Sequence, residues 1–229
     1  MATYAWPTTL TWGAGEFEMR VIPNAIVFTS PYSKSTQVVD FLGERWQIRM
    51  DVPGGIDARR GAAFEAFFDR LRGPVNLVSI WNMRRPVPQG TLQDGGGSAQ
   101  WKTATSTNAT WQTSVPAAAT WSYSGPVLYA AAQLTNSVTV CRNPGTTVFA
   151  GDHFGAGLQL FRVMADATAD STGRLVVEVL PRVRTALNNG TTVLCTRPTA
   201  NFMLKAEGVP VTWQPGMFSG ISFELIESF

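Results

Sequence analysis

One stretch of the chain, residues 44–82, changes its hydrophobic period twice, and this change restricts the folds available to it. Between 45 and 52, apolar and polar side chains alternate, which is the period of a strand with one buried face. From 64 to 71, apolar residues fall at positions i, i+3, i+4 and i+7, which form one face of an amphipathic helix. Residues 75–81 are a second apolar run of strand length. The stretch therefore predicts a strand, a helix and a second strand.

The ends of the predicted helix carry signals of their own. The Pro-Gly-Gly at 53–55 predicts a break after the first strand, and Asp57 is a candidate N-cap because its carboxylate can accept from free amides. The Gly-Pro at 73–74 predicts the helix end. A helix with this much aromatic surface must lie on a sheet, and the two flanking strands are the nearest candidates. The residues predicted to form this core are Trp46, Ile48, Phe64, Phe67, Phe68, Leu71 and Trp81.

Short strands are predicted on both sides of this unit. Residues 16–21 alternate like a strand with one solvated face, and 25–28 begin another. The polar-tipped segment 30–43 indicates an extended arm or hairpin, and an ordinary surface hairpin is the slightly favoured interpretation. Residues 138–198 contain several short strands separated by turns, a pattern typical of a small barrel or sandwich. Two further strands within 199–229 are predicted to return to the first unit.

Residues 92–137 differ in composition, because Ser, Thr, Ala and Gly dominate them. A quasi-repeat with a period of ten residues places Trp101, Trp111 and Trp121 after Ala-Gln or Ala-Thr. Three such copies are too short for a solenoid, and short strands or arms that each place one indole fit better. The indoles are candidate contacts for a partner or a glycan. Packing on the flank of the adjoining domain is the favoured interpretation, since tryptophan is usually mostly buried.

Charge and hydropathy exclude two classes of partner. The 18 basic and 16 acidic residues leave a formal charge of +2, whereas nucleic-acid-binding domains usually carry a clustered basic excess. No specific nucleic-acid partner is therefore expected. No apolar run approaches the roughly 18 residues that a membrane span requires, so no membrane span is expected. The N-terminus shows no secretory signal, and synthesis and folding in a cytoplasm are the expectation.

Candidate catalytic and metal-binding residues are few in this sequence. His153 is the only histidine, and a lone histidine in a turn is usually solvated or locally hydrogen-bonded. Cys141 and Cys195 lie far apart without a CxxC pair, so a zinc ligand set is lacking. Two buried free thiols are favoured over a disulfide in a cytoplasmic product. We expect no enzyme activity, no metal and no cofactor.

Two runs of this sequence, AFEAFFDRLRGPVN and the following RRPVPQGT, carry a family resemblance. They resemble the tail-structure proteins of long-tailed bacteriophages, and most of all the distal tail protein family of the tail tip, or baseplate hub. The resemblance covers about residues 1–91 and 199–229, and it is weaker between them. In that family, a small β-rich domain with one helix oligomerises into a ring between the tail tube and the tip complex. A long hairpin near 30–43 reaches over the next subunit there, and a second β domain is attached or inserted.

Together, the patterns and the resemblance imply a mainly β fold in two domains. Residues 1–91 and 199–229 would form a discontinuous, tail-tube-like β domain that builds the ring and contains the strand-helix-strand unit at 44–82. Residues 92–198 would form an inserted β module. This module would hold the tryptophan repeat in 92–137 and a small β-barrel in 138–198.

The resemblance also implies a function and a set of partners. It implies a virion structural protein of the tail, made and folded in the cytoplasm of the host bacterium. Its partners would be further copies of itself in a closed ring, the tail tube protein, and tail-tip or hub proteins. Six copies would match the symmetry of the tube and are favoured, while three would suit a hub. The alternative is a carbohydrate- or receptor-binding β module that contacts a host surface glycan or receptor through exposed tryptophans.

Overall fold

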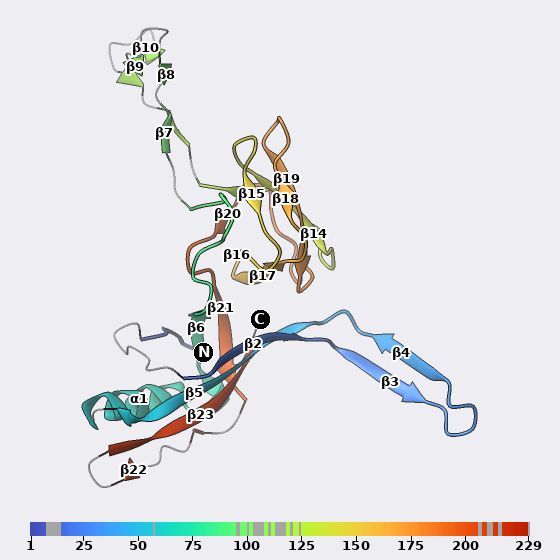
Figure 1. Cartoon of the computed structure of the whole chain (residues 1–229), viewed down its shortest axis with the longest axis vertical. Helices are drawn as coiled ribbons and strands as arrows, with labels where there is room; N and C mark the ends of the chain where they lie inside the picture. The colour runs from blue at the N-terminus through green and yellow to red at the C-terminus, as the bar shows by residue number, and fades with distance from the viewer. Residues whose placement is uncertain are drawn as a thin grey trace.

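The computed structural model describes residues 1–7, 15–56, 58–94, 97–99, 101–102, 108–109, 111–112, 118–119, 121–123, 125–205, 208–209, 213–214 and 217–228. Figure 1 shows a twisted sheet that carries the helix, a barrel beside it, and a two-stranded arm that extends away from the sheet. Within the described part of the chain, no helix is long and apolar enough to cross a membrane.

Strands from both ends of the chain build the sheet. It has seven strands in the order β1-β6-β21-β23-β5-β2, with β22 paired to β23. Strands β1 and β6 run parallel, and the other neighbours run antiparallel. The bounds are Thr3–Ala5 (β1), Phe17–Ile22 (β2), Arg45–Ile56 (β5), Leu77–Trp81 (β6), Thr199–Leu204 (β21), Trp213–Gln214 (β22) and Met217–Glu227 (β23). The barrel is therefore inserted between two halves of one sheet.

The helix α1 (Ala58–Leu71) covers one face of this sheet (Figure 1). Its buried residues recur with the helical period and are Gly61, Phe64, Phe68 and Leu71. The Phe68 ring packs edge-on against Phe223 of β23, with ring centroids 4.7 Å apart, and Trp6 stacks on the same Phe223 at 6.1 Å. The last strand of the chain, which the sequence pattern did not place under the helix, therefore supports it.

The boundaries of α1 differ slightly from the predicted ones. The predicted N-cap, Asp57, lies outside the described residues. After the helix, Arg72 adopts a left-handed conformation and Gly73–Val75 form the 3-10 turn η1. Strand β6 begins at Leu77 for this reason, and not at Val75.

Strand β5 continues through the Pro-Gly-Gly at 53–55, where the sequence pattern predicted a break. Proline has no N–H to donate, so a strand tolerates it where one side lacks a neighbour or the register is irregular. Both conditions hold, because the ladder with β2 reaches only to Met50 and the ladder with β23 shifts register beside Pro53, next to Gly220. Gly220 adopts a φ of +110°, which L side chains rarely take. The predicted strand end was therefore wrong.

Residues 127–194 form a closed six-stranded barrel in the order β13-β14-β19-β17-β16-β20. The bounds are Val127–Leu128 (β13), Ser137–Cys141 (β14), His153–Ala156 (β16), Gln159–Val163 (β17), Arg174–Leu180 (β19) and Thr191–Leu194 (β20), with a side ladder of Thr147–Val148 (β15) and Ala167–Thr168 (β18). Strand β13 is very short, yet it closes the barrel by pairing with both β14 and β20. So short a strand leaves no periodic signal, and the barrel therefore begins before the predicted boundary at 138.

Two further features complete the fold. The arm, residues 25–40, consists of β3 (Ala25–Thr29) paired with β4 (Thr36–Asp40). Six short strands lie in the chain between β6 and the first barrel strand, β13. They are Gly97–Ala99 (β7), Trp101–Lys102 (β8), Asn108–Ala109 (β9), Trp111–Gln112 (β10), Ala118–Ala119 (β11) and Trp121–Tyr123 (β12). The prediction of a mainly β fold with a packed helix and a small β-barrel is confirmed.

Candidate assembly surface and interdomain junction

The arm exposes apolar side chains to solvent. Every residue of β3 and β4 is exposed, including Phe28 at 54% and Val38 at 63%. A two-stranded hairpin by itself is at best marginally stable in water, and exposed apolar patches mark interaction sites. The arm is therefore a candidate contact with another surface.

The register of the arm places apolar side chains on both of its faces. Directly paired residues share a face, and successive residues along a strand point to opposite faces. Ile26 pairs with Val39, and Val27 pairs with Val38, so each face carries one of these apolar pairs. A hairpin that only lies flat on a protein needs one apolar face. Apolar side chains on both faces suit an arm that is held between two protein surfaces.

The tip of the arm is ordered by its own hydrogen bonds. The Ser30 N–H donates to the Ser35 carbonyl at 2.9 Å, and the Lys34 N–H donates to the Ser30 carbonyl at 3.0 Å. The hydroxyls of Ser33 and Ser35 lie 2.7 Å apart. The turn is thus shaped before any partner binds, which lowers the entropy cost of docking.

Two chain crossings connect the sheet to the barrel, and carboxylates hold both of them. Where the chain enters the barrel, Asp152 accepts from the backbone N–H of Gly90 at 3.2 Å. Where the chain returns, Asp94 accepts from the backbone N–H groups of Cys195 and Thr196. Hydrogen bonds to an ionised acceptor are stronger than neutral ones. These crossings therefore fasten the barrel to the sheet domain.

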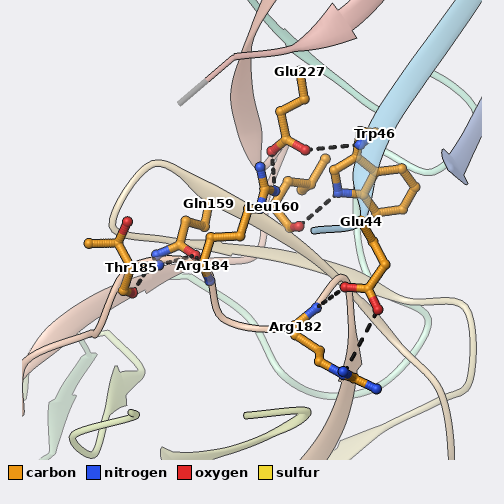
Figure 2. A network of polar contacts seen from close by, with 8 residues as sticks. All are labelled: Glu44, Trp46, Gln159, Leu160, Arg182, Arg184, Thr185 and Glu227. Carbon is orange, nitrogen blue, oxygen red and sulfur yellow. Dashed lines mark hydrogen bonds and ion pairs between the residues drawn. The ribbon is translucent and has the colours of Figure 1, made fainter. Parts of the chain in front are cut away.

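A buried polar network joins the sheet and the barrel directly, as Figure 2 shows. Trp46 of β5 is fully buried, and its indole N–H donates to the Leu160 carbonyl of β17 at 2.8 Å. The backbone N–H of Trp46 donates to the Glu227 carboxylate at 3.0 Å, and the Arg184 guanidinium donates to the same carboxylate. One network thus includes β5, the end of β23 and the loop between β19 and β20.

The same loop is held at two more points in Figure 2. The Glu44 carboxylate accepts from the backbone N–H of Arg182 at 3.3 Å, and its other oxygen lies 3.9 Å from the guanidinium. On the barrel side, the Gln159 amide oxygen accepts from the Arg184 N–H at 2.8 Å, and its nitrogen donates to the Thr185 carbonyl at 2.9 Å. The loop is therefore fixed between the two domains.

The buried ion pair dominates the electrostatics of this junction. Burial raises the pKa of the Glu227 carboxyl above its usual range, and the Arg184 guanidinium opposes this shift. A buried charge is tolerated when it is paired and hydrogen-bonded, and it is costly when it is left alone. Removing either side chain should therefore cost stability, because the other would stay buried without this ion pair.

His153 also lies at this junction. The sequence predicted a turn histidine that is solvated or locally hydrogen-bonded. The turn and the solvation were wrong, because β16 begins at His153 and the side chain is buried. Its ring centroid is 5.7 Å from that of Trp46, and its Nε2 is 3.4 Å from the Asn82 amide nitrogen. Burial, with the cations Arg162 and Arg85 nearby, lowers the pKa of His153 to about 4. The ring is therefore uncharged at neutral pH.

Acidification is expected to weaken the fold through His153. The unfolded chain takes up a proton near pH 6.5, whereas the folded chain takes it up only near pH 4. The contribution of the uncharged His153 to the free energy of unfolding, roughly 3 kcal/mol, is complete above pH 6.5 and is lost as the pH falls toward 4. Thermal unfolding between pH 7.5 and 4.5 should show a steeper loss of Tm for the wild type than for His153→Gln. Parallel losses in the two proteins would contradict this role.

The predicted core residues lie in two environments. Between α1 and the sheet, the structure places Phe64, Phe68 and Leu71 in buried positions and Phe67 in a half-buried one. Ile48 is buried in the same cluster. The two tryptophans face the barrel connection, since Trp46 bonds to Leu160 and the Arg197 guanidinium lies 5.4 Å from the Trp81 ring centroid.

The predicted contact residues Trp101, Trp111 and Trp121 are the first residues of β8, β10 and β12. Their side chains lie outside what the structure describes. The sequence pattern did not predict a role for Glu227 and Arg184, which lie 43 residues apart in the chain. A signal for Glu227 existed, because the alternation that buries Ile221, Phe223 and Leu225 continues to position 227.

Metal and thiol chemistry find little support in the described residues. Among them, no group of three or more His, Cys, Asp or Glu side chains is arranged to hold a metal ion. Both cysteines are free thiols, with Cys195 buried and Cys141 half-buried. Burial and the neighbouring Asp94 carboxylate raise the pKa of Cys195 far above its ordinary value, so this thiol stays protonated.

Neither the protein-family models nor the curated proteins contain a match. The function is therefore inferred from the exposed arm and from the rigid connection between the domains.

Proposed function

We propose that this protein is a structural component of a phage tail tip. In this role, copies of the chain form a closed ring that joins the tail tube to the distal tip and its receptor-binding apparatus. The observation that supports it most is the arm, which exposes apolar side chains on both faces. The role is geometric and requires no catalytic group.

A second copy of the chain is the partner that suits the arm best. The arm connects β2 to β5, and β2 is an edge strand of the sheet. Figure 1 shows the arm continuing outward from this edge, away from its own sheet. A neighbouring copy beside that edge would cover both the arm and the unpaired edge groups of β2. Covering an edge strand also removes a site of uncontrolled association.

The size of the apolar gain favours a closed ring over an open chain. The five large apolar residues of β3 and β4 are 43–63% exposed, and they are Ile26, Val27, Phe28, Val38 and Val39. Burying the exposed half of such side chains contributes about 4–7 kcal/mol per arm. Association costs about 4–15 kcal/mol in lost translational and rotational freedom, so the net free energy of one arm contact is close to zero. A ring in which every copy gives and receives one arm gains one contact more than an open chain of equal length.

The fixed junction between sheet and barrel supports the same role. A connector must keep the proteins on its two sides aligned. Two domains joined by a hinge would let those proteins move relative to each other. Two carboxylate-held crossings and a buried network tie this barrel to its sheet. We infer that the sheet domains build the ring, with the tail tube protein and the hub proteins as the remaining partners in the virion tail.

Native mass spectrometry over a concentration series from about 1 to 100 µM tests this proposal. We expect one discrete closed oligomer, of six copies or of three, in equilibrium with the monomer. A protein that stays monomeric throughout, or a ladder of every size without a closed species, would speak against the ring.

A further inference from the structure

A group of nitrogen donors lies on the outer face of the barrel, where the barrel meets the sheet. His153 of β16 pairs with Arg162 of β17, so these two side chains share a face. Their neighbours Phe154 and Phe161 point the other way, into the barrel core. Trp46 of the sheet lies against the shared face, with its ring centroid 5.7 Å from that of His153 and 5.0 Å from the Arg162 Cζ. The indole therefore holds both side chains in place.

A second arginine, Arg85, is held beside this face by the backbone at Gly151. Its Nη1 donates to the Gly151 carbonyl at 2.8 Å. Gly151 adopts a φ of +90°, and a Cβ at this position would overlap the same Nη1. Arg85 belongs to the segment that follows β6, where the chain leaves the sheet. The sheet side and the barrel thus both contribute cations to one place.

Two of these donor atoms lack a protein acceptor within the described part of the chain. The Nδ1 of His153 and the Nε of Arg162 are buried without a hydrogen bond of normal geometry, although the Gly151 carbonyl lies near the imidazole. The Nε2 of His153 lies 3.4 Å from the Asn82 amide nitrogen. When this amide donates to Nε2, the imidazole proton is on Nδ1, which is then a donor. Buried donors without an acceptor are costly and rare in proteins.

The charge around these donors is positive. Neither Arg162 nor Arg85 forms an ion pair with another described residue. Burial and the Arg85 guanidinium both lower the pKa of Arg162. The nearest acid, Asp152, already accepts from three backbone N–H groups. An anion placed between the two arginines would therefore be attracted by charges that no described carboxylate pairs with.

The arrangement of the donors matches a tetrahedral oxyanion better than a carboxylate. The donors come from three segments, which are the chain after β6, β16 and β17. A carboxylate offers two oxygens in one plane, whereas a phosphate offers oxygens in several directions around one atom. Guanidinium groups bind phosphate through short, charge-assisted hydrogen bonds. Arg85 is exposed, so an anion reaches the group from solvent on its side.

We propose that His153, Arg162 and Arg85 form a binding site for a phosphate group at the junction of the sheet and the barrel. The bound anion accepts hydrogen bonds from both arginines and from the imidazole Nδ1. It links the segment after β6 to β16 and β17, and it stabilises the folded chain because the unfolded chain has no such site. This binding is additional to ring formation and does not depend on it.

The single histidine of the chain makes a direct NMR test possible. In protein labelled with [15N]histidine, the Nδ1 and Nε2 signals report on this site without further assignment. Titration with sodium phosphate at pH 7 should shift the Nδ1 signal along a saturating curve, with a Kd of about 1 mM or below. Sodium chloride at equal ionic strength should not. The same shift with both salts, or none with phosphate up to about 50 mM, would overturn the proposal.

A pH titration of the same signals tests whether the anion lies beside the imidazole. Sulfate replaces phosphate here, because sulfate keeps its charge between about pH 4.5 and 7.5. A neighbouring anion favours the charged imidazolium, so sulfate should raise the pKa of His153 relative to chloride. An unchanged pKa would place the anion elsewhere and contradict the assignment.

Substitutions distinguish a built site from general attraction to a basic surface. Arg162→Gln and Arg85→Gln should each weaken phosphate binding by at least about 10-fold, because each removes a charge-assisted hydrogen bond. Arg174 is the matched control, since it is another barrel arginine over an aromatic ring, 5.3 Å from the Tyr129 centroid. Arg174→Gln should keep the Kd within about twofold. Equal weakening in all three variants would refute the site.

Thermal unfolding checks that lost binding does not reflect a lost fold. Arg85 is exposed, so Arg85→Gln should keep a Tm near that of the wild type in chloride. Phosphate at ten times the Kd should raise the Tm by about 3–6 °C in the wild type and in Arg174→Gln. It should not raise the Tm of Arg85→Gln. An equal rise in Arg85→Gln would mean that phosphate acts elsewhere on the protein.

Discussion

Glutamate at both Phe28 and Val38 is expected to leave the protein folded but monomeric. The arm register puts these two positions on opposite faces, so the double substitution places one carboxylate on each face. Neither side chain packs in the core, since both are more than half exposed in the single chain. The fold itself should therefore lose little stability, within about 0.5 kcal/mol per site.

The effect on assembly is expected to be large, because the net free energy of each arm contact is close to zero. Losing two apolar side chains from the interface removes roughly 2–4 kcal/mol, and a desolvated carboxylate adds a further penalty. The dissociation constant should rise by at least about 100-fold per contact. Native mass spectrometry should show only the monomer at concentrations where the wild type forms its oligomer.

A matched substitution on the barrel controls for charge and exposure. Val176 of β19 is an exposed strand valine, 61% exposed against 63% for Val38. Val176→Glu should keep the wild-type oligomer, whereas Val38→Glu alone should already weaken it. Equal loss of assembly in the two variants would mean that added charge, and not the arm, causes the effect.

Removing the Arg184 side chain is expected to destabilise the junction by about 3–5 kcal/mol. Arg184→Ala removes the ion pair and leaves the Glu227 carboxylate buried, where it still accepts a hydrogen bond from the backbone N–H of Trp46. Chemical denaturation at pH 7.5 measures the loss in free energy of unfolding. For comparison, Lys205→Ala breaks the exposed pair with Glu224 and should cost less than about 1 kcal/mol.

The pH dependence of Arg184→Ala identifies the unpaired carboxylate as the cause. Burial already raises the pKa of Glu227, and loss of Arg184 removes the main opposing charge, although Arg45 still acts in the same direction. A group with a raised folded pKa contributes most below its unfolded value, and that contribution is lost as the pH rises through the folded pKa. The deficit of the variant should therefore be smaller at pH 5 than at pH 8.

A double variant provides a second check on the junction. Arg184→Met combined with Glu227→Gln removes both charges while keeping side chains of similar length. It should recover a large part of the stability lost in Arg184→Ala, because no uncompensated charge remains. If the double variant is as unstable as Arg184→Ala and neither responds to pH, the loss reflects packing alone.

The sequence pattern was reliable where structure is set by neighbours in the chain. The period of 64–71 predicted the buried stripe of α1, and the short strands of 138–198 predicted a small barrel or sandwich, which is a closed barrel in the structure. It failed where a distant segment decides the outcome. Pro53 continues a strand because β2 has already ended beside it, and His153 is buried because Trp46 lies against it.

By itself, the sequence determined the local conformations and the ten-residue quasi-repeat that contains Trp101, Trp111 and Trp121. Periodicity states which side of an element is apolar, because it depends only on the geometry of a helix or strand. It does not state what covers that side. Only the tertiary structure decided that the arm stays uncovered, and that Glu227 finds its cation in Arg184, 43 residues away. Both outcomes depend on contacts between distant segments, which no local pattern encodes.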